Sequence, residues 1–284
     1  MTPCYCFEIS AQSTEDTDRL SGLLALCAPY GWEEQNCAAG RTRFLVCSEH
    51  LEYIRQVSKA VQENLPHLVC SMTETEGRDW ISAWREYFTP VACGTRFVVV
   101  PPWLGKECFS GRTPIVIEPK SAFGTGHHAS TVLCLRALSD LLDAGGVCRG
   151  QTFMDWGSGS GVLAIACAKS GLSGLALDID QLAVDNALEN IAINRVGNVA
   201  VVKGNLDYVV ERGGRYDIIL ANILAGPLIE FAPCVVRLLA KDACLILSGM
   251  LEGQADRVEA AYLAEGLAAA KRLRDGEWTA LVWD

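Results

Sequence analysis

Several features of membrane, secreted and nucleic-acid-binding proteins are scarce in this sequence of 284 residues. No uninterrupted apolar run approaches the roughly 20 residues that a helix needs to cross a bilayer. The first twenty residues are rich in acidic side chains and contain no apolar core segment, so we expect no secretory signal. Lys and Arg number 24 against 34 Asp and Glu, which gives a formal net charge of −10. We therefore expect a cytoplasmic protein without a membrane segment and without direct binding to nucleic acids.

Recognisable metal and disulfide patterns are also missing. The 13 cysteines include no pair in CxxC spacing, and several lie inside apolar segments, where a free cysteine behaves as a small core residue. Histidines number four, and the adjacent pair His127 and His128 is not accompanied by further ligands at metal-site spacing. We therefore predict a reduced protein with neither a disulfide framework nor a metal site.

The first part of the chain alternates short strand and helix patterns. Periodicity predicts strands at 4–10, 41–48 and 67–74, a further strand within 30–39, and helices at 14–28 and 49–64 capped by Ser13 and Ser48. This order is typical of a small α+β, ferredoxin-like domain, which we assign to residues 1–76. Residues 77–112 are predicted to be a linker, in which the aromatic stripe of 79–88 packs between the two domains.

From residue 113 the pattern changes to regular alternation of strands and helices. Strands are expected near 115–118, 152–156, 174–178, 199–203, 216–222 and 243–248, with helices near 129–143, 160–170, 181–194, 225–239 and 253–265. Several of these strands are nearly continuous apolar runs, as in parallel strands buried on both faces. Residues 113–284 are therefore predicted to form an α/β, doubly wound, mostly parallel Rossmann-like sheet with its ligand at the carboxyl ends of the strands.

A glycine-rich turn follows the strand that ends at Asp155. Gly157, Gly159 and Gly161 stand at alternate positions before a helix, which lets the backbone approach a ligand closely and leaves free N–H groups facing it. A phosphate-binding P-loop is excluded because no Lys-Ser/Thr pair follows the glycines. A dinucleotide-binding loop is disfavoured because the G-x-G-x-G spacing is one residue tighter than G-x-G-x-x-G.

An S-adenosylmethionine site fits this turn better, since that cofactor has no phosphate and needs an acid for its ribose. Asp178 ends the next strand, about 20 residues after the glycines, which is the spacing expected of a ribose ligand. A plain glycine turn with a solvated acid is the structural alternative. Asp180 is better interpreted as a helix N-cap.

Two further polar residues are candidates for the same site. Asn222 ends an apolar strand at the carboxyl edge, where its amide offers one acceptor and two donors to a substrate nitrogen or to the cofactor. Thr131 follows the glycine-rich segment around Gly124 and Gly126 and is expected to face the cofactor. Ordinary helix capping is the alternative for both residues.

The segments SAFGTGHHAST, DWGSGSGVLAIA, LDID, ANILAGPL, LSGML and GEW together resemble the ribosomal protein L11 methyltransferases in order and spacing. That resemblance covers about residues 112–284. It implies an S-adenosylmethionine-dependent protein N-methyltransferase that modifies lysine side chains or the N-terminal α-amine of a basic large-subunit ribosomal protein. It also implies that Thr131, Gly157, Asp178 and Asn222 contact the cofactor, and that the smaller domain recognises the substrate.

We take Gly159 as a further cofactor-binding residue and Asn222 as the catalytic one. The alternatives are a methyltransferase for another protein's lysine or for a small amine, and a non-catalytic module that binds the cofactor. An NAD-dependent oxidoreductase is a more distant alternative because of the glycine spacing.

Overall fold

The computed structural model describes residues 3–28, 32–37, 41–48, 50–76, 89–104, 109, 111–118 and 128–284. The chain divides into two compact units, residues 1–88 and 89–284, which are described separately. The aromatic stripe of 79–88 and most of the GTGHH segment lie outside the described residues. None of the helices described is both long and apolar enough to span a bilayer.

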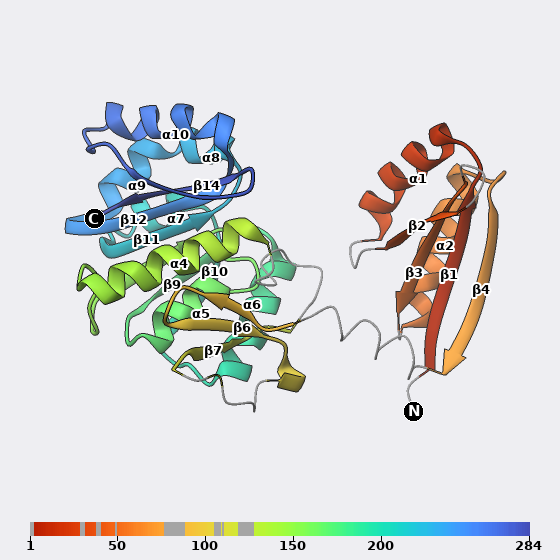
Figure 1. Cartoon of the computed structure of the whole chain (residues 1–284), viewed down its shortest axis with the longest axis horizontal. Helices are drawn as coiled ribbons and strands as arrows, with labels where there is room; N and C mark the ends of the chain where they lie inside the picture. The colour runs from red at the N-terminus through yellow and green to blue at the C-terminus, as the bar shows by residue number, and fades with distance from the viewer. Residues whose placement is uncertain are drawn as a thin grey trace. The chain divides into compact units, whose positions relative to one another are not determined.

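The first unit is a four-stranded antiparallel sheet with two helices, as predicted (Figure 1). Its elements are β1 (Pro3–Ala11), α1 (Thr14–Cys27), β2 (Glu33–Cys37), β3 (Arg41–Ser48), α2 (Leu51–Asn64) and β4 (Val69–Glu76). The strands lie in the order β2-β3-β1-β4, which is the ferredoxin-like arrangement. Apolar side chains at helical spacing, such as Leu20 and Leu24 of α1 and Ile54 and Val57 of α2, form its core with alternate residues of β1 and β3.

Two predictions for this unit are wrong in detail. Ser13 does cap α1, but the N-cap of α2 is His50, and the Ser48 hydroxyl accepts the His50 N–H instead.

The structure also contains a disulfide between Cys6 and Cys47, although we predicted none. These cysteines are directly opposite each other in the β1–β3 ladder, with Cα atoms 4.2 Å apart. Strand register brought them together, and a separation of 41 residues in sequence gives no sign of it.

The second unit begins at residue 89, earlier than the predicted boundary at 113. Part of the predicted linker forms strands β5 (Val91–Cys93) and β6 (Phe97–Val100), and β6 pairs in parallel with β7 (Thr113–Val116). These strands make a separate three-stranded sheet, so the segment expected near 115–118 is not part of the large sheet. Phe97, Val99 and Ile115 are buried in the core of the second unit, which explains why the sheet belongs there.

The large sheet has seven strands in the order β10-β9-β8-β11-β12-β14-β13 (Figure 1). Its strands are β8 (Thr152–Trp156), β9 (Ser173–Asp178), β10 (Val199–Lys203), β11 (Tyr216–Asn222), β12 (Leu239–Leu251), β13 (Lys271–Asp275) and β14 (Trp278–Trp283). Strands β8 to β12 run parallel, whereas β14 is antiparallel to β12 and β13. The chain leaves β8 toward β9 and β10 and later returns to place β11 on the other side of β8. The topological switch point therefore lies between β8 and β11.

Helices cover both faces of this sheet, and each face has its own apolar core. The helices are α4 (Ala129–Ala144), α5 (Val162–Lys169), α6 (Gln181–Asn194), α7 (Leu206–Val210), α8 (Ala225–Glu230), α9 (Ala232–Leu238) and α10 (Glu252–Ala264). Alternate residues of one strand divide between the cores: Ile218 packs with α4 and α5, whereas Ile219 packs with α8 to α10. Burial on both faces explains the continuous apolar runs, and it confirms the doubly wound prediction.

The sequence predicted most elements of the large sheet and its helices, but it missed helix α7 and strands β13 and β14. The helix expected over 225–239 is two helices that meet at Phe231, and Pro233 lies in the first turn of the second one, where a missing N–H costs no hydrogen bond. The short helix α7 and the hairpin of β13 and β14 were not predicted. The GEW segment lies at that hairpin, since Gly276 precedes Trp278 at the start of β14.

Candidate functional site

The predicted site residues lie at the carboxyl ends of three neighbouring strands. The glycine loop follows β8, Asp178 ends β9 and Asn222 ends β11. Because β8 lies between β9 and β11, these groups border the crevice at the topological switch point, where open α/β sheets bind ligands. Thr131, in the first turn of α4, joins this group through its contact with Asn222.

The glycine loop has a backbone that residues with side chains rarely adopt. Gly157, Gly159 and Gly161 have φ angles of 75°, 52° and 79°. A Cβ on Gly157 would stand 2.2 Å from Cγ2 of Ile223, the residue after Asn222, so only glycine lets the loop approach the end of β11. Gly157 N–H and Ser158 N–H both donate to the Leu177 carbonyl, which fastens the loop to β9.

Asp178 is half-buried and contacts the same loop directly. Its Oδ2 accepts the Gly159 N–H at 2.8 Å, and its Oδ1 accepts the Asp180 N–H at 3.0 Å. A carboxylate has about four acceptor positions, so two remain available. Asp180 caps α6 by accepting the Leu182 N–H, as predicted. The two acids therefore differ: one caps a helix, and the other faces the loop with acceptor capacity to spare.

The side chains of Asn222 and Thr131 are brought together although they are 91 residues apart. The Asn222 Nδ2 donates to the Thr131 Oγ1 at 3.1 Å. Neither side chain caps a helix, because the N-cap of α8 is Leu224 and that of α4 is His128. The Asn222 Oδ1 is buried and has no hydrogen-bond partner within the described part of the chain. A buried acceptor without a donor is costly, so this oxygen is a candidate position for a donor from a ligand.

His128, from the GTGHH segment, connects the start of α4 with the C-terminal hairpin. Its Nδ1 lies 2.8 Å from the Ser130 hydroxyl and accepts the Ser130 N–H at 3.3 Å. Its ring packs edge-on against Trp278, with ring centroids 4.5 Å apart. Two of the segments that carried the sequence resemblance thus meet in space. Among the described residues, His128 is in no group of three or more His, Cys, Asp or Glu that could hold a metal ion.

Asp155 is a fully buried carboxyl group beneath the glycine loop, and sequence reasoning gave it no role. Its Oδ2 accepts the Ala164 N–H at 3.0 Å, while its Oδ1 has no partner within the described residues. Burial raises the pKa of this carboxyl to about 7, with a smaller upward contribution from the charge of Asp178. The signal available in the sequence was an acid at the end of an otherwise apolar strand.

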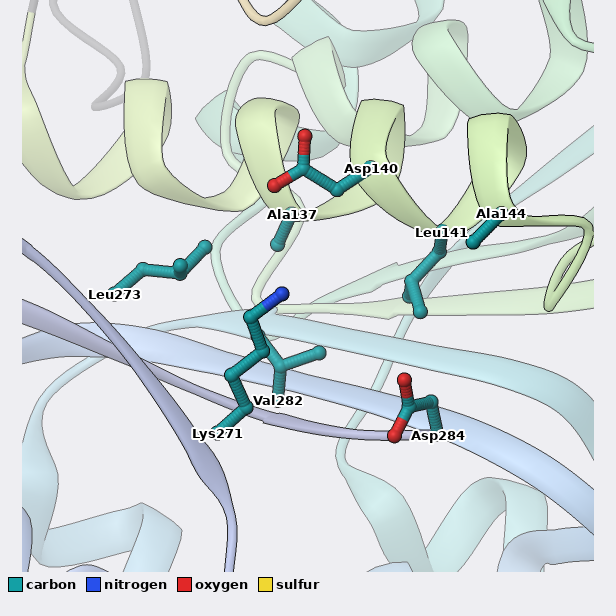
Figure 2. Close-up of a pocket in the computed structure, with 8 residues that line it drawn as sticks. All are labelled: Ala137, Asp140, Leu141, Ala144, Lys271, Leu273, Val282 and Asp284. Carbon is teal, nitrogen blue, oxygen red and sulfur yellow. The ribbon is translucent and has the colours of Figure 1, made fainter.

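A hollow lies elsewhere on this unit, between α4 and the β13–β14 hairpin (Figure 2). Asp140, Lys271 and Asp284 line it together with apolar residues of α4, β13 and β14. None of the predicted site residues lines it. The crevice at the switch point therefore remains the candidate site.

Comparison with a solved structure identifies the class of protein. The structure of a ribosomal protein L11 methylase from Lactobacillus delbrueckii subsp. bulgaricus superposes with a TM-score of 0.61 at 30% sequence identity. The match covers 69% of this chain and 97% of that one. Together with the glycine loop after β8 and the acid at the end of β9, this likeness defines the chain as an enzyme, a Rossmann-like methyltransferase.

Sequence comparison then identifies the family. The family model for ribosomal protein L11 methyltransferase (PrmA) matches residues 12–284. A ribosomal protein L11 methyltransferase from Pelotomaculum thermopropionicum is 41% identical over 236 residues, which is 82% of this chain and 74% of that protein. One from Listeria monocytogenes is 34% identical over 246 residues, 84% of this chain and 77% of that protein. The chain belongs to the ribosomal protein L11 methyltransferase family, which confirms the sequence resemblance.

Proposed function

We propose that this enzyme transfers methyl groups from S-adenosylmethionine to amino groups of ribosomal protein L11. The observation that carries the proposal is the buried Asn222 Oδ1, an acceptor without a donor at the crevice edge. A neutral amine offers the N–H that this oxygen lacks. The names of the relatives support L11 as the protein that presents the amine.

The residues around the crevice fit S-adenosylmethionine. The free acceptor positions of Asp178 suit the two ribose hydroxyls, and the turn through Gly157 and Gly159 exposes backbone without a Cβ in the way. Thr131 and Asn222 border the same crevice from the other side. The cofactor's contribution is an electrophilic methyl group on a positively charged sulfur. We assign its binding to Thr131, Gly157, Gly159, Asp178 and Asn222.

The protein must hold the acceptor amine in line with the methyl group and in its neutral form. Deprotonating a lysine of pKa ~10.4 at pH 7 costs about 4.6 kcal/mol, and an α-amine of pKa ~8 costs about 1.4 kcal/mol. Partial burial lowers the pKa of an ammonium group and offsets part of this cost. We propose that the Asn222 Oδ1 accepts an N–H of the neutral amine and orients its lone pair. The ammonium form of the substrate gives its proton to water before the neutral amine accepts the methyl group.

The remaining assignments follow from charge and from the division of the chain. The net charge of −10 suits a basic protein substrate and disfavours a phosphate backbone. We assign substrate recognition to the α+β unit, methyl transfer to the larger unit, and the cytoplasm as the place where the enzyme meets its ribosomal substrate.

The test is methyl transfer from labelled S-adenosylmethionine to purified L11 and, in parallel, to a total ribosomal protein extract. We expect label on L11, at lysine or N-terminal amines located by mass spectrometry. We also expect the rate to rise between pH 7 and 9, because more of the amine becomes neutral. Label on a different protein would replace L11 as substrate. Cofactor binding without transfer would indicate a non-catalytic module, and a flat pH profile with chemistry rate-limiting would contradict the neutral-amine mechanism.

A further inference from the structure

Leu224 is an exposed apolar residue two positions after Asn222, where β11 gives way to α8. Leu224 is 74% exposed, the highest value among the large apolar residues described. It is also the N-cap of α8, and it makes no side-chain capping hydrogen bond there. Leu224 therefore stands at the same edge of the sheet as the proposed amine acceptor.

Local folding does not account for a leucine at this position. Helix N-caps favour Ser, Thr, Asp and Asn, whose side chains accept the free N–H groups of the first turn, and leucine is among the poorest choices. The exposed Leu224 also contributes little hydrophobic stabilisation to the fold, because most of its apolar area stays in water. Single exposed leucines are ordinary on protein surfaces. Leu224, however, neither caps the helix through its side chain nor packs in the core.

The backbone that carries Leu224 is held on two sides. The Ile223 N–H donates to the Ser248 carbonyl at 3.2 Å, and the Ile223 side chain fills the space left by the missing Cβ of Gly157. A Cβ on Gly249 of β12 would stand 2.4 Å from the Ile223 carbonyl oxygen, so β12 also approaches closely. Leu224 is thus presented from a fixed backbone, as a contact with a specific ligand requires.

We infer that Leu224 contacts the aliphatic stem of the lysine whose amine Asn222 receives, and so determines the preference for a lysine side chain. The inference rests on the proposed function. A lysine carries four methylene groups below its ammonium, and these bury readily against apolar surface while the nitrogen reaches a polar partner. Covering the stem also removes water from around the amine, which favours its neutral form.

The test compares Leu224→Ser with the wild-type enzyme on L11 and S-adenosylmethionine, using the full chain. Serine supplies the capping acceptor that leucine lacks, so the melting temperature should stay the same or rise. For lysine methylation we expect kcat/KM to fall about 5- to 20-fold, mainly through a higher KM for L11. The dissociation constant of the cofactor should change less than about twofold, since the stem contact involves only the protein substrate.

Two more variants complete the design. Leu224→Met keeps an apolar side chain of similar volume and should retain most of the wild-type kcat/KM. Leu263→Ser makes the matched change at an exposed leucine near the end of α10 and should leave kinetics unchanged. An unchanged KM in Leu224→Ser, or a lower melting temperature together with lost cofactor affinity, would overturn the inference. If the wild-type enzyme methylates no L11 at all, the proposed function fails, and this inference fails with it.

Discussion

The two sides of the crevice differ in how their polar groups are satisfied. On the β9 side, the Asp178 carboxylate already accepts two backbone N–H groups and has room for more. On the β11 side, the Asn222 amide donates to Thr131, while its buried oxygen has no donor within the described residues. The first side is held by hydrogen bonds within the chain, and we propose that it receives the cofactor. We propose that the donor missing on the second side comes from the substrate amine.

The largest expected effect comes from removing the unpartnered acceptor. Asn222→Ala should lower kcat by roughly a hundredfold, because the amine loses its orientation toward the methyl group. The dissociation constant of S-adenosylmethionine should change far less. Single-turnover transfer and calorimetry measure the two quantities. Asn64→Ala, an exposed asparagine of α2 that bonds the Ala60 carbonyl, is the control. Equal losses in turnover and cofactor affinity would make Asn222 only a binding residue. The Asn222 and Asp178 sides of the crevice would then no longer differ in function.

The next effect belongs to the β9 side. Asp178→Ala should weaken S-adenosylmethionine binding by roughly 1.5–3 kcal/mol, the usual size for lost hydrogen bonds to a charged group. The neighbouring Asp180→Ala is the matched control, since Asp180 caps α6. That variant should lose about 1 kcal/mol of folding stability with little change in cofactor affinity. Calorimetric affinities that are the same in Asp178→Ala and wild type would exclude Asp178 as the ribose ligand.

The smallest effect concerns Asp155, below the glycine loop. Burial raises the pKa of its carboxyl to about 7, above the value near 3.8 expected in the unfolded chain. The folded state therefore holds this proton more tightly. The stability it contributes is complete below about pH 3.8 and is lost as the pH rises through about 7. Between pH 6 and 8 this amounts to a fall of about 1.4 kcal/mol in the free energy of unfolding.

Asp155→Asn should abolish that fall, since an amide does not titrate and its oxygen can still accept the Ala164 N–H. Denaturant unfolding at pH 6 and pH 8 measures the difference between wild type and variant. Asp185→Asn, on the exposed face of α6, should retain the wild-type pH dependence. If the free energy of unfolding of Asp155→Asn falls between pH 6 and 8 as much as that of the wild type, Asp155 does not titrate in this range. Its carboxyl group would then be a buried anion beneath the glycine loop.

The sequence predicted the α+β unit well because its elements follow local rules. Leu20 and Leu24 of α1 repeat at helical spacing, and Ser13 supplies the cap that begins the helix. The disulfide between Cys6 and Cys47 could not be predicted in this way. It depends on the register of two strands, which no local pattern contains.

The candidate site likewise has features that local sequence patterns predict and features that depend on the tertiary structure. The glycines and Asp178 were recognisable because a tight turn and an acid at a fixed spacing leave a pattern within one βαβ segment. Asp155 received no role, because a pKa near 7 arises from the burial of its surroundings and not from its neighbours in sequence. The unit boundary was placed too late because β6 pairs with β7 across a gap of 12 residues between Val100 and Thr113.

The sequence by itself determined the alternation of strands and helices, the glycine turn, the acid that follows it and the family. Those features depend on residue type, periodicity and short spacing. The tertiary structure alone decided that the Asn222 amide meets Thr131 from a helix 91 residues away, and that its oxygen is left without a donor. The physical reason is that burial and hydrogen-bond satisfaction depend on which groups the sheet order brings together.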